Sequence, residues 1–133
     1  MSTSLRAQPL ILVVDHEQAL LDAVTAVLTA SGFACRCCTS AEQAVAEAEH
    51  AVPDLILSDT NLQGDSGVEI GRLLQQHPRL ADVPTMFLSG AQMPDIIRRA
   101  HAWHVRKVLD PQVILKLIEQ ALAEVAGRQL AHA

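Results

Sequence analysis

Aromatic residues are scarce in this chain of 133 residues, which contains one Trp, two Phe and no Tyr. Hydrophobic residues still make up 50% of the sequence, so the core must be built from Leu, Ile, Val and Ala. Basic residues are also few, with 10 Lys and Arg against 15 Asp and Glu and a net charge of -5. Because nucleic-acid-binding surfaces are normally basic, this balance argues against direct nucleic-acid contact.

Long hydrophobic runs are absent as well. The apolar stretch near the N-terminus, residues 9–14 (PLILVV), is too short for a membrane span or for the hydrophobic region of a signal peptide. We therefore expect a cytoplasmic protein without membrane contact. The length fits one domain over residues 1–133, long enough to bury a single sizeable core.

Cysteines are few and crowded into one predicted strand, at positions 35, 37 and 38. No CxxC pair or His-bearing partner motif accompanies them, which argues against a metal or redox role. Neighbouring residues of a strand point to opposite faces, so at most Cys35 and Cys37 share a side. We interpret all three as small buried hydrophobic residues.

Apolar runs alternate with segments of helical periodicity along the whole chain. The runs predict strands at 9–14, 33–38, 54–58, 83–88 and about 103–109. Helices are predicted at 18–30, after the capping residue Ser40, at 66–76, at about 93–101, and from Pro111 to a stop at Gly127. Strict alternation predicts an α/β fold, a doubly wound five-stranded parallel sheet of order 2-1-3-4-5 with helices on both faces.

Polar residues stand at the ends of these strands. In the predicted order, Asp15 and Asp59 end strands one and three and meet at the switch point, where such folds bind ligands. Ser89 and Lys107 flank that crevice. Two carboxylates beside a hydroxyl and an ammonium suit a phosphoryl-acceptor site, in which a carboxylate takes the phosphoryl group and a divalent metal offsets its charge. The segment DHEQA contains no glycine, which argues against a nucleotide-binding or flavodoxin-like enzyme.

The chain resembles response-regulator receiver domains, the CheY-like family of two-component signalling. The resemblance covers about residues 8–125 and is carried by the segments PLILVVDHEQALLDAV, PDLILSDTNLQGDSGVEI, PTMFLSGA and KVLDPQVILKLI. It implies a single receiver domain without an effector domain in cis. It further implies that the protein is a phospho-acceptor rather than an enzyme, capable at most of self-catalysed phosphoryl transfer and autodephosphorylation.

The resemblance also implies a role for each site residue. Asp59 is the phospho-acceptor, Ser89 the switch hydroxyl and Lys107 the family's lysine, while His104 takes the place of the switching aromatic residue. Asp15, Asp59 and the backbone carbonyl of Asn61 are the expected ligands of Mg²⁺.

Four departures from the family pattern affect this site. His16 replaces the usual second acid, and because Mg²⁺ prefers oxygen ligands we expect weak Mg²⁺ binding. An alternative is that protonated His16 supplies the missing positive charge, which would favour phosphorylation at lower pH. Gln63 and Val108 replace two prolines, and the segment from Ser89 to Lys107 is about one helical turn short. A rival alignment matches Asp110-Pro111 to the Lys-Pro pair and leaves the pocket without a lysine.

Two interpretations of function follow from the resemblance. In the first, a histidine kinase or phosphotransfer protein phosphorylates Asp59. A downstream protein then binds the face formed by the fourth predicted helix (about 93–101), the fifth strand (about 103–109) and the fifth helix (from Pro111). In the second, the chain is a degenerate receiver that acts as a phosphorylation-independent interaction module. A homodimer is compatible with either interpretation.

Overall fold

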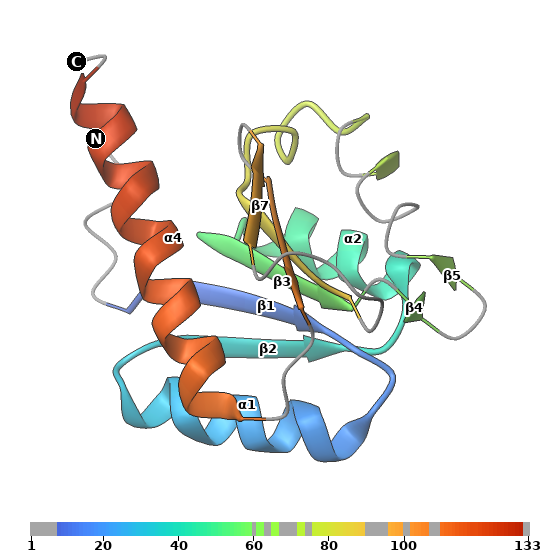
Figure 1. Ribbon diagram of the computed structural model, residues 1–133. Coiled ribbons are helices and arrows are strands. Elements are labelled where there is room, and N and C mark those ends of the chain that lie inside the picture. Colours follow the sequence, from blue (N-terminus) through green and yellow to red (C-terminus); the bar gives the residue numbers. More distant parts are fainter. Residues whose placement is uncertain are drawn as a thin grey trace.

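The apolar runs predicted to be strands form one sheet in the computed structural model (Figure 1). The structure describes residues 8–59, 61–62, 65–66, 72–73, 76–89, 96–99, 102–106 and 110–131. The parallel strands are β1 (Leu10–Val14), β2 (Ala34–Cys38), β3 (Leu55–Asp59), β6 (Thr85–Ser89) and β8 (Ala102–Arg106). Their order, β2-β1-β3-β6-β8, confirms the predicted order 2-1-3-4-5.

Helices cover both faces of the sheet, as predicted (Figure 1). Helices α1 (Gln18–Ala30) and α4 (Pro111–Ala131) lie on one face, and α2 (Ala41–His50) lies on the other. Successive strand residues point to opposite faces, so Ile11 and Val13 of β1 pack toward α1 and α4 while Leu12 and Val14 pack toward α2. The described residues therefore form two mainly aliphatic cores, one on each side of the sheet, and Trp103 and Phe33 belong to the core that packs against α1 and α4.

Local sequence signals begin and end the first two helices. The backbone N–H of Ser31, just after α1, donates to the carbonyls of Val27 and Leu28, and Gly32 then takes a φ of 93°. Only glycine adopts that left-handed conformation without strain, so the chain reverses there. The hydroxyl of Ser40 accepts a hydrogen bond from the Gln43 N–H at 3.2 Å, which caps α2 as the sequence predicts.

The predicted helix at 93–101 is wrong. The structure places β7 (Ile96–Arg99) there, antiparallel to β8 at the edge of the sheet. Only two residues separate β7 from β8. Antiparallel strands can be joined by a two-residue turn, whereas a parallel crossover needs a dozen residues or more. A hairpin thus fits the short segment between Ser89 and the last helix better than a helix does.

Other boundaries also differ from the sequence prediction. Helix α4 continues through Gly127 to Ala131, because Gly127 lacks the positive φ of a stop and good helix formers follow it. The predicted loop after Asp59 contains two short antiparallel strands, β4 (Asn61–Leu62) and β5 (Asp65–Ser66). Ser66 therefore lies in β5 rather than in a helix. Within the helix predicted at 66–76, Arg72 and Leu73 are helical in the structure. Lys107 and Val108 lie outside the described residues.

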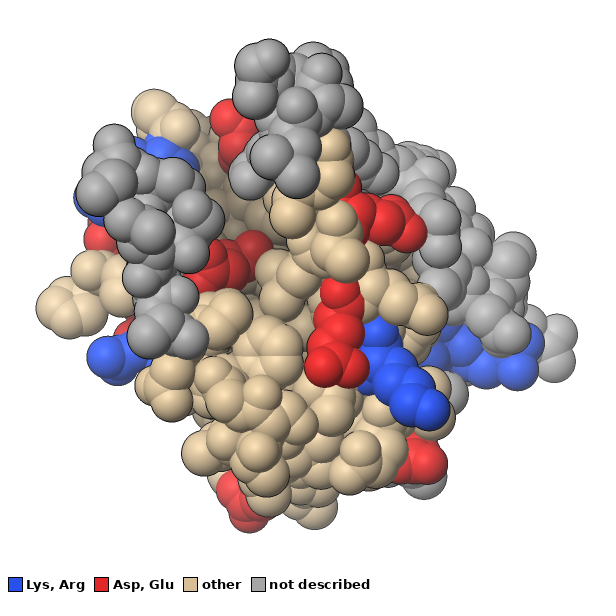
Figure 2. All heavy atoms as spheres, turned by 90° about the vertical axis from the view of Figure 1, so that its left-hand side faces the viewer, with Lys and Arg blue, Asp and Glu red and all other residues tan. Residues whose placement is uncertain are grey.

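Charged side chains are mixed on the face at the amino ends of the parallel strands. Figure 2 shows acidic and basic groups there interspersed with uncharged ones, without a continuous basic patch among the described residues in view. This distribution agrees with the acidic net charge. In the part of the chain that the structure describes, no helix has both the length and the apolar character needed to cross a membrane.

Candidate functional site

The carboxyl ends of β1 and β3 bring Asp15 and Asp59 together. The strands are parallel neighbours with Val14 paired to Ser58, so the next residue of each chain segment is an aspartate at the same edge. Asp15 is 1% exposed and Asp59 is 2% exposed. Burying two carboxylates side by side is unfavourable unless other groups compensate their charge. The predicted meeting of these two acids at the switch point is therefore observed.

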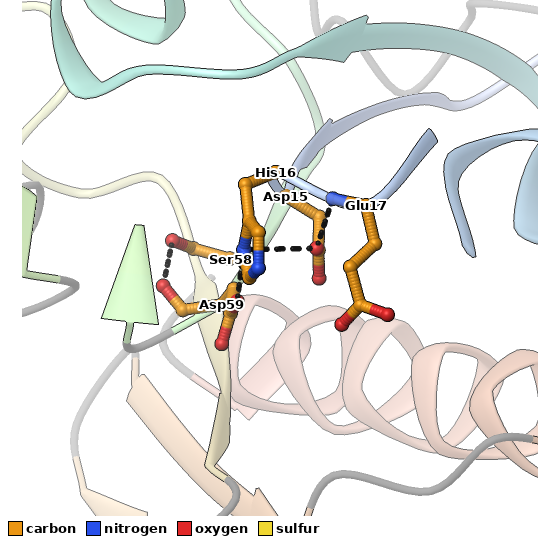
Figure 3. Close-up of polar contacts among 5 residues, drawn as sticks. All are labelled: Asp15, His16, Glu17, Ser58 and Asp59. Carbon is orange, nitrogen blue, oxygen red and sulfur yellow. Dashed lines mark hydrogen bonds and ion pairs between the residues drawn. The ribbon is translucent and has the colours of Figure 1, made fainter. Parts of the chain in front are cut away.

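The His16 imidazole lies between the two carboxylates (Figure 3). Its Nδ1 is 3.2 Å from Oδ2 of Asp59 and 3.6 Å from Oδ1 of Asp15. The His16 side chain is 39% exposed and thus covers the more buried acids from the solvent side. When protonated, this ring places a positive charge against both carboxylates. The family pattern has an acid at this position. In this chain His16 stands there, and it contacts both aspartates.

Backbone hydrogen bonds hold the acids in place. The N–H of Glu17 donates to Oδ1 of Asp15 at 2.9 Å, and the N–H of Asp15 donates to the carbonyl of Cys38 at 3.1 Å. The Ser58 hydroxyl donates to the backbone carbonyl of Asp59 at 3.0 Å. Sequence reasoning missed the contributions of Glu17 and Ser58. The hydrogen bond from Glu17 could have been predicted. An Asp placed just before a helix often accepts a hydrogen bond from the backbone N–H two residues later.

Two of the remaining predicted residues, Ser89 and His104, lie on strands of the same sheet. Ser89 ends β6, one residue beyond Leu88, which pairs with Asp59. His104 of β8 pairs with Phe87 of β6, and the two rings stack with centroids 5.1 Å apart. The backbone of Asn61 begins β4 two residues after Asp59. Lys107 and the side chains of Ser89 and Asn61 lie outside the described residues, so their proposed roles stay predictions.

The donor atoms at this edge match Mg²⁺ poorly. Asp15, His16 and Glu17 each offer a ligand atom within 4.8 Å of the others, and two of these atoms are oxygens. Mg²⁺ prefers six oxygens in near-octahedral geometry, whereas an imidazole nitrogen suits borderline ions such as Zn²⁺ better. Here the nitrogen already contacts both Asp15 and Asp59. Weak Mg²⁺ binding therefore stays a prediction, which rests on this donor set.

Similar proteins point to one family. The chain is 34% identical over 79 residues to the phosphate regulon transcriptional regulatory protein PhoB of Pseudomonas aeruginosa, covering 59% of this chain and 34% of that protein. It is 33% identical over 81 residues to PhoB of Rhizobium meliloti, which covers 61% of this chain and 36% of that protein. The chain thus spans about a third of the length of these relatives.

A solved structure shares the fold, and a family model covers most of the chain. The chemotaxis response regulator CheY4 of Vibrio cholerae superposes with a TM-score of 0.74 at 20% identity, over 85% of this chain and 98% of that one. The sequence model of the response regulator receiver domain matches residues 11–124. Together with two buried aspartates at the expected strand ends, these matches show that the chain belongs to the response regulator receiver domains of two-component signalling.

Proposed function

We propose that this protein is a single-domain receiver that accepts a phosphoryl group on Asp59 from a histidine kinase or phosphotransfer protein. The observation that carries the proposal is the position of Asp59, which ends β3 beside Asp15 and contacts the His16 ring at 3.2 Å. Receiver domains as a family interact with such kinases and phosphotransfer proteins. The cytoplasmic location expected from the sequence is part of this proposal.

The chemistry of the transfer follows from the carboxylate. A carboxylate oxygen of Asp59 attacks the phosphorus of the donor, a new O–P bond forms, and the bond from phosphorus to the donor breaks. The electron pair stays with the donor, which takes a proton from water. The transfer adds negative charge next to Asp15, so it requires a positive group nearby. Protonated His16 supplies one at the distance observed, while the Mg²⁺ ion of other receivers fits this donor set poorly.

The His16 ring must move before Asp59 can react. Asp59 is 2% exposed, and a phosphoryl donor needs access to one of its oxygens in line with the leaving group. The more exposed His16 side chain can turn outward about its own bonds, since rotamer changes of exposed residues are fast. The ring can then contact the transferred oxygens instead of the free carboxylate.

We further propose that the signal leaves through the edge formed by β7, β8 and α4. The helix predicted at about 93–101 is replaced there by β7, so the output surface differs from the one predicted from the sequence. Ser89 and His104 are the proposed switch residues, and the Phe87–His104 stack links the β6 strand to this edge. Lys107 is proposed to approach the phosphoryl group from the segment after β8.

Phosphorylation by acetyl phosphate tests the proposal. The full chain is incubated with acetyl phosphate, with and without Mg²⁺, and its mass is measured. We expect the gain of one phosphoryl group, lost on Asp59→Asn substitution and kept on Asp82→Asn substitution, since Asp82 is an exposed acid between elements. A wild-type chain that gains no phosphoryl group from acetyl phosphate or from any histidine kinase would contradict the proposal.

A degenerate receiver that needs no phosphorylation is the second candidate. The contact of His16 with both buried carboxylates favours it, because the imidazole occupies the approach to Asp59. Beryllofluoride distinguishes the two candidates. NMR shifts at the backbone of Asp59 and Ser89 on adding beryllofluoride are expected for a working acceptor, whereas an unchanged spectrum is expected for the degenerate one.

A further inference from the structure

The second strand carries two thiols that the acidic pocket does not use. Sequence reasoning took all three cysteines as buried hydrophobic residues, which the structure confirms for Cys38, 1% exposed, but not for Cys37, which is exposed. Cys35 is partly buried against the core formed with α1 and α4. Strand β2 is at the edge of the sheet, and among the described strands it pairs only with β1. The Cys37 thiol is therefore open to solvent beside a partly buried second thiol.

Cys35, Cys37 and Thr25 form one hydrogen-bonded cluster. The two cysteines are two residues apart on β2, so their side chains point to the same face, toward α1. The Thr25 hydroxyl of α1 lies 3.1 Å from the Cys37 sulfur and 3.5 Å from the Cys35 sulfur. The Thr25 hydroxyl therefore contacts both sulfurs, and it can donate a hydrogen bond to a thiolate on Cys37.

The surroundings of the more exposed thiol favour its ionised form. The neighbouring Cys35 thiol and the Thr25 hydroxyl lower the pKa of Cys37 to about 6, while burial and Asp22 act in the opposite direction. The neighbouring Cys37 thiol and partial burial raise the pKa of Cys35. Burial raises the pKa of Cys38 to about 12. Asp22 of α1, itself accepting a hydrogen bond from Gln18 at 2.8 Å, is the charged group that acts on Cys37 from the helix.

We propose that Cys37 is a thiol-modification site that forms mixed disulfides with low-molecular-weight disulfides, with Cys35 and Thr25 as positioning residues that hold its thiolate. The Cys37 sulfur attacks one sulfur of the reagent, a new S–S bond forms, the old one breaks, and the released thiolate takes a proton from water. An internal Cys35–Cys37 disulfide is less favourable. The Cα atoms of residues two apart on a strand are about 6.6 Å from each other, which is near the upper limit of the Cα–Cα distance in disulfides.

Glutathione disulfide is the probe for the test. The full chain is incubated with it between pH 5.5 and 8.5, and the modified residue is found by mass spectrometry of peptides. We expect one glutathionyl group on Cys37, absent in Cys37→Ser. At pH 6 the folded chain should react about tenfold faster than the same chain in urea, because its thiolate is already formed, and this advantage should disappear by pH 8 because a more acidic thiolate is a weaker nucleophile.

Variants of the neighbours separate this role from a structural one. Thr25→Val removes the hydroxyl beside the Cys37 sulfur, and Cys35→Ala removes the neighbouring thiol that lowers the pKa of Cys37, so each should raise the pH midpoint of the reaction. Thr25→Ser should keep the midpoint near the wild-type value. Cys38→Ala is the matched control and should leave the midpoint unchanged. Preferred reaction at Cys35 or Cys38, an internal Cys35–Cys37 disulfide as the main product, or a midpoint unaffected by Thr25→Val would each overturn the proposal.

Discussion

His16 is the residue whose chemistry departs furthest from that of its relatives' pocket. Its Nδ1 lies 3.2 Å from Asp59 and 3.6 Å from Asp15, at the position where the family pattern has a second acid. A protonated ring offers one charge and one N–H in this direction, whereas a divalent ion offers two charges and several coordination positions. Phosphoryl transfer to Asp59 should consequently depend less on Mg²⁺ than in receivers with two acids.

Replacing His16 by aspartate should restore Mg²⁺ binding. The substitution exchanges a nitrogen donor for an oxygen donor and adds a negative charge beside two carboxylates, so we expect affinity to rise by at least about tenfold, or about 1.4 kcal/mol. The measurement is an Mg²⁺ titration followed by NMR shifts of the amides of Asp15 and Asp59. The His50→Asp variant is the control, because it makes the same change at an exposed position near the C-terminal end of α2. Equal titrations of wild type and His16→Asp would refute the prediction.

At the scale of elements, the cap of α2 depends on one hydroxyl. Ser40 Oγ accepts from the Gln43 N–H at 3.2 Å, and Gln43 Oε1 in turn accepts from the N–H of Thr39 at 3.0 Å. Ser40→Ala should lower the free energy of unfolding by about 1 kcal/mol, while Ser40→Asp should keep most of it. Urea unfolding measures the change. Ser31→Ala is the control, since Ser31 contributes its backbone N–H to α1; a Ser40→Ala loss no larger than the Ser31→Ala loss would contradict the cap.

Helix α4 supplies a second element-scale test from adjacent turns. Ile118 is fully buried against the sheet, whereas Val113 on the same helix is 40% exposed. Ile118→Ala should cost about 2–5 kcal/mol because it leaves a cavity in the larger core, and Val113→Ala should change stability by less than about 0.5 kcal/mol. Chemical denaturation of both variants checks this. Similar losses at the two positions would mean that α4 does not pack as described.

At the scale of the whole molecule, stability should be highest at the middle of the sheet. Strand β1 has a neighbour on each side and five buried residues, while β2 pairs with β1 alone among the described strands and exposes Arg36 and Cys37. Amide hydrogen exchange should therefore be slowest in β1 and β3 and faster in β2, although β1 and β2 have the same length. Equal protection of β1 and β2 would argue that the sheet opens only as a unit.

The edge of the sheet shows why part of the fold escaped sequence analysis. Residues 96–99 (IIRR) are short and carry no periodicity that distinguishes a strand from a helical turn. Alternation along the chain favoured a helix there, yet the two-residue link to β8 permits a hairpin. Gly127 failed as a stop because it does not take the left-handed conformation by which a glycine ends a helix.

The sequence by itself determined the parallel order of five strands, the two faces of helices and the meeting of Asp15 with Asp59, because apolar runs of strand length, periodic segments and strand-end acids are local signals that leave few arrangements. Only the tertiary structure decided that the His16 nitrogen lies against both acids and that Cys37 stays exposed while Cys38 is buried. Those outcomes depend on which side chains face each other across strands and helices, and the order of residues in the chain does not specify these contacts.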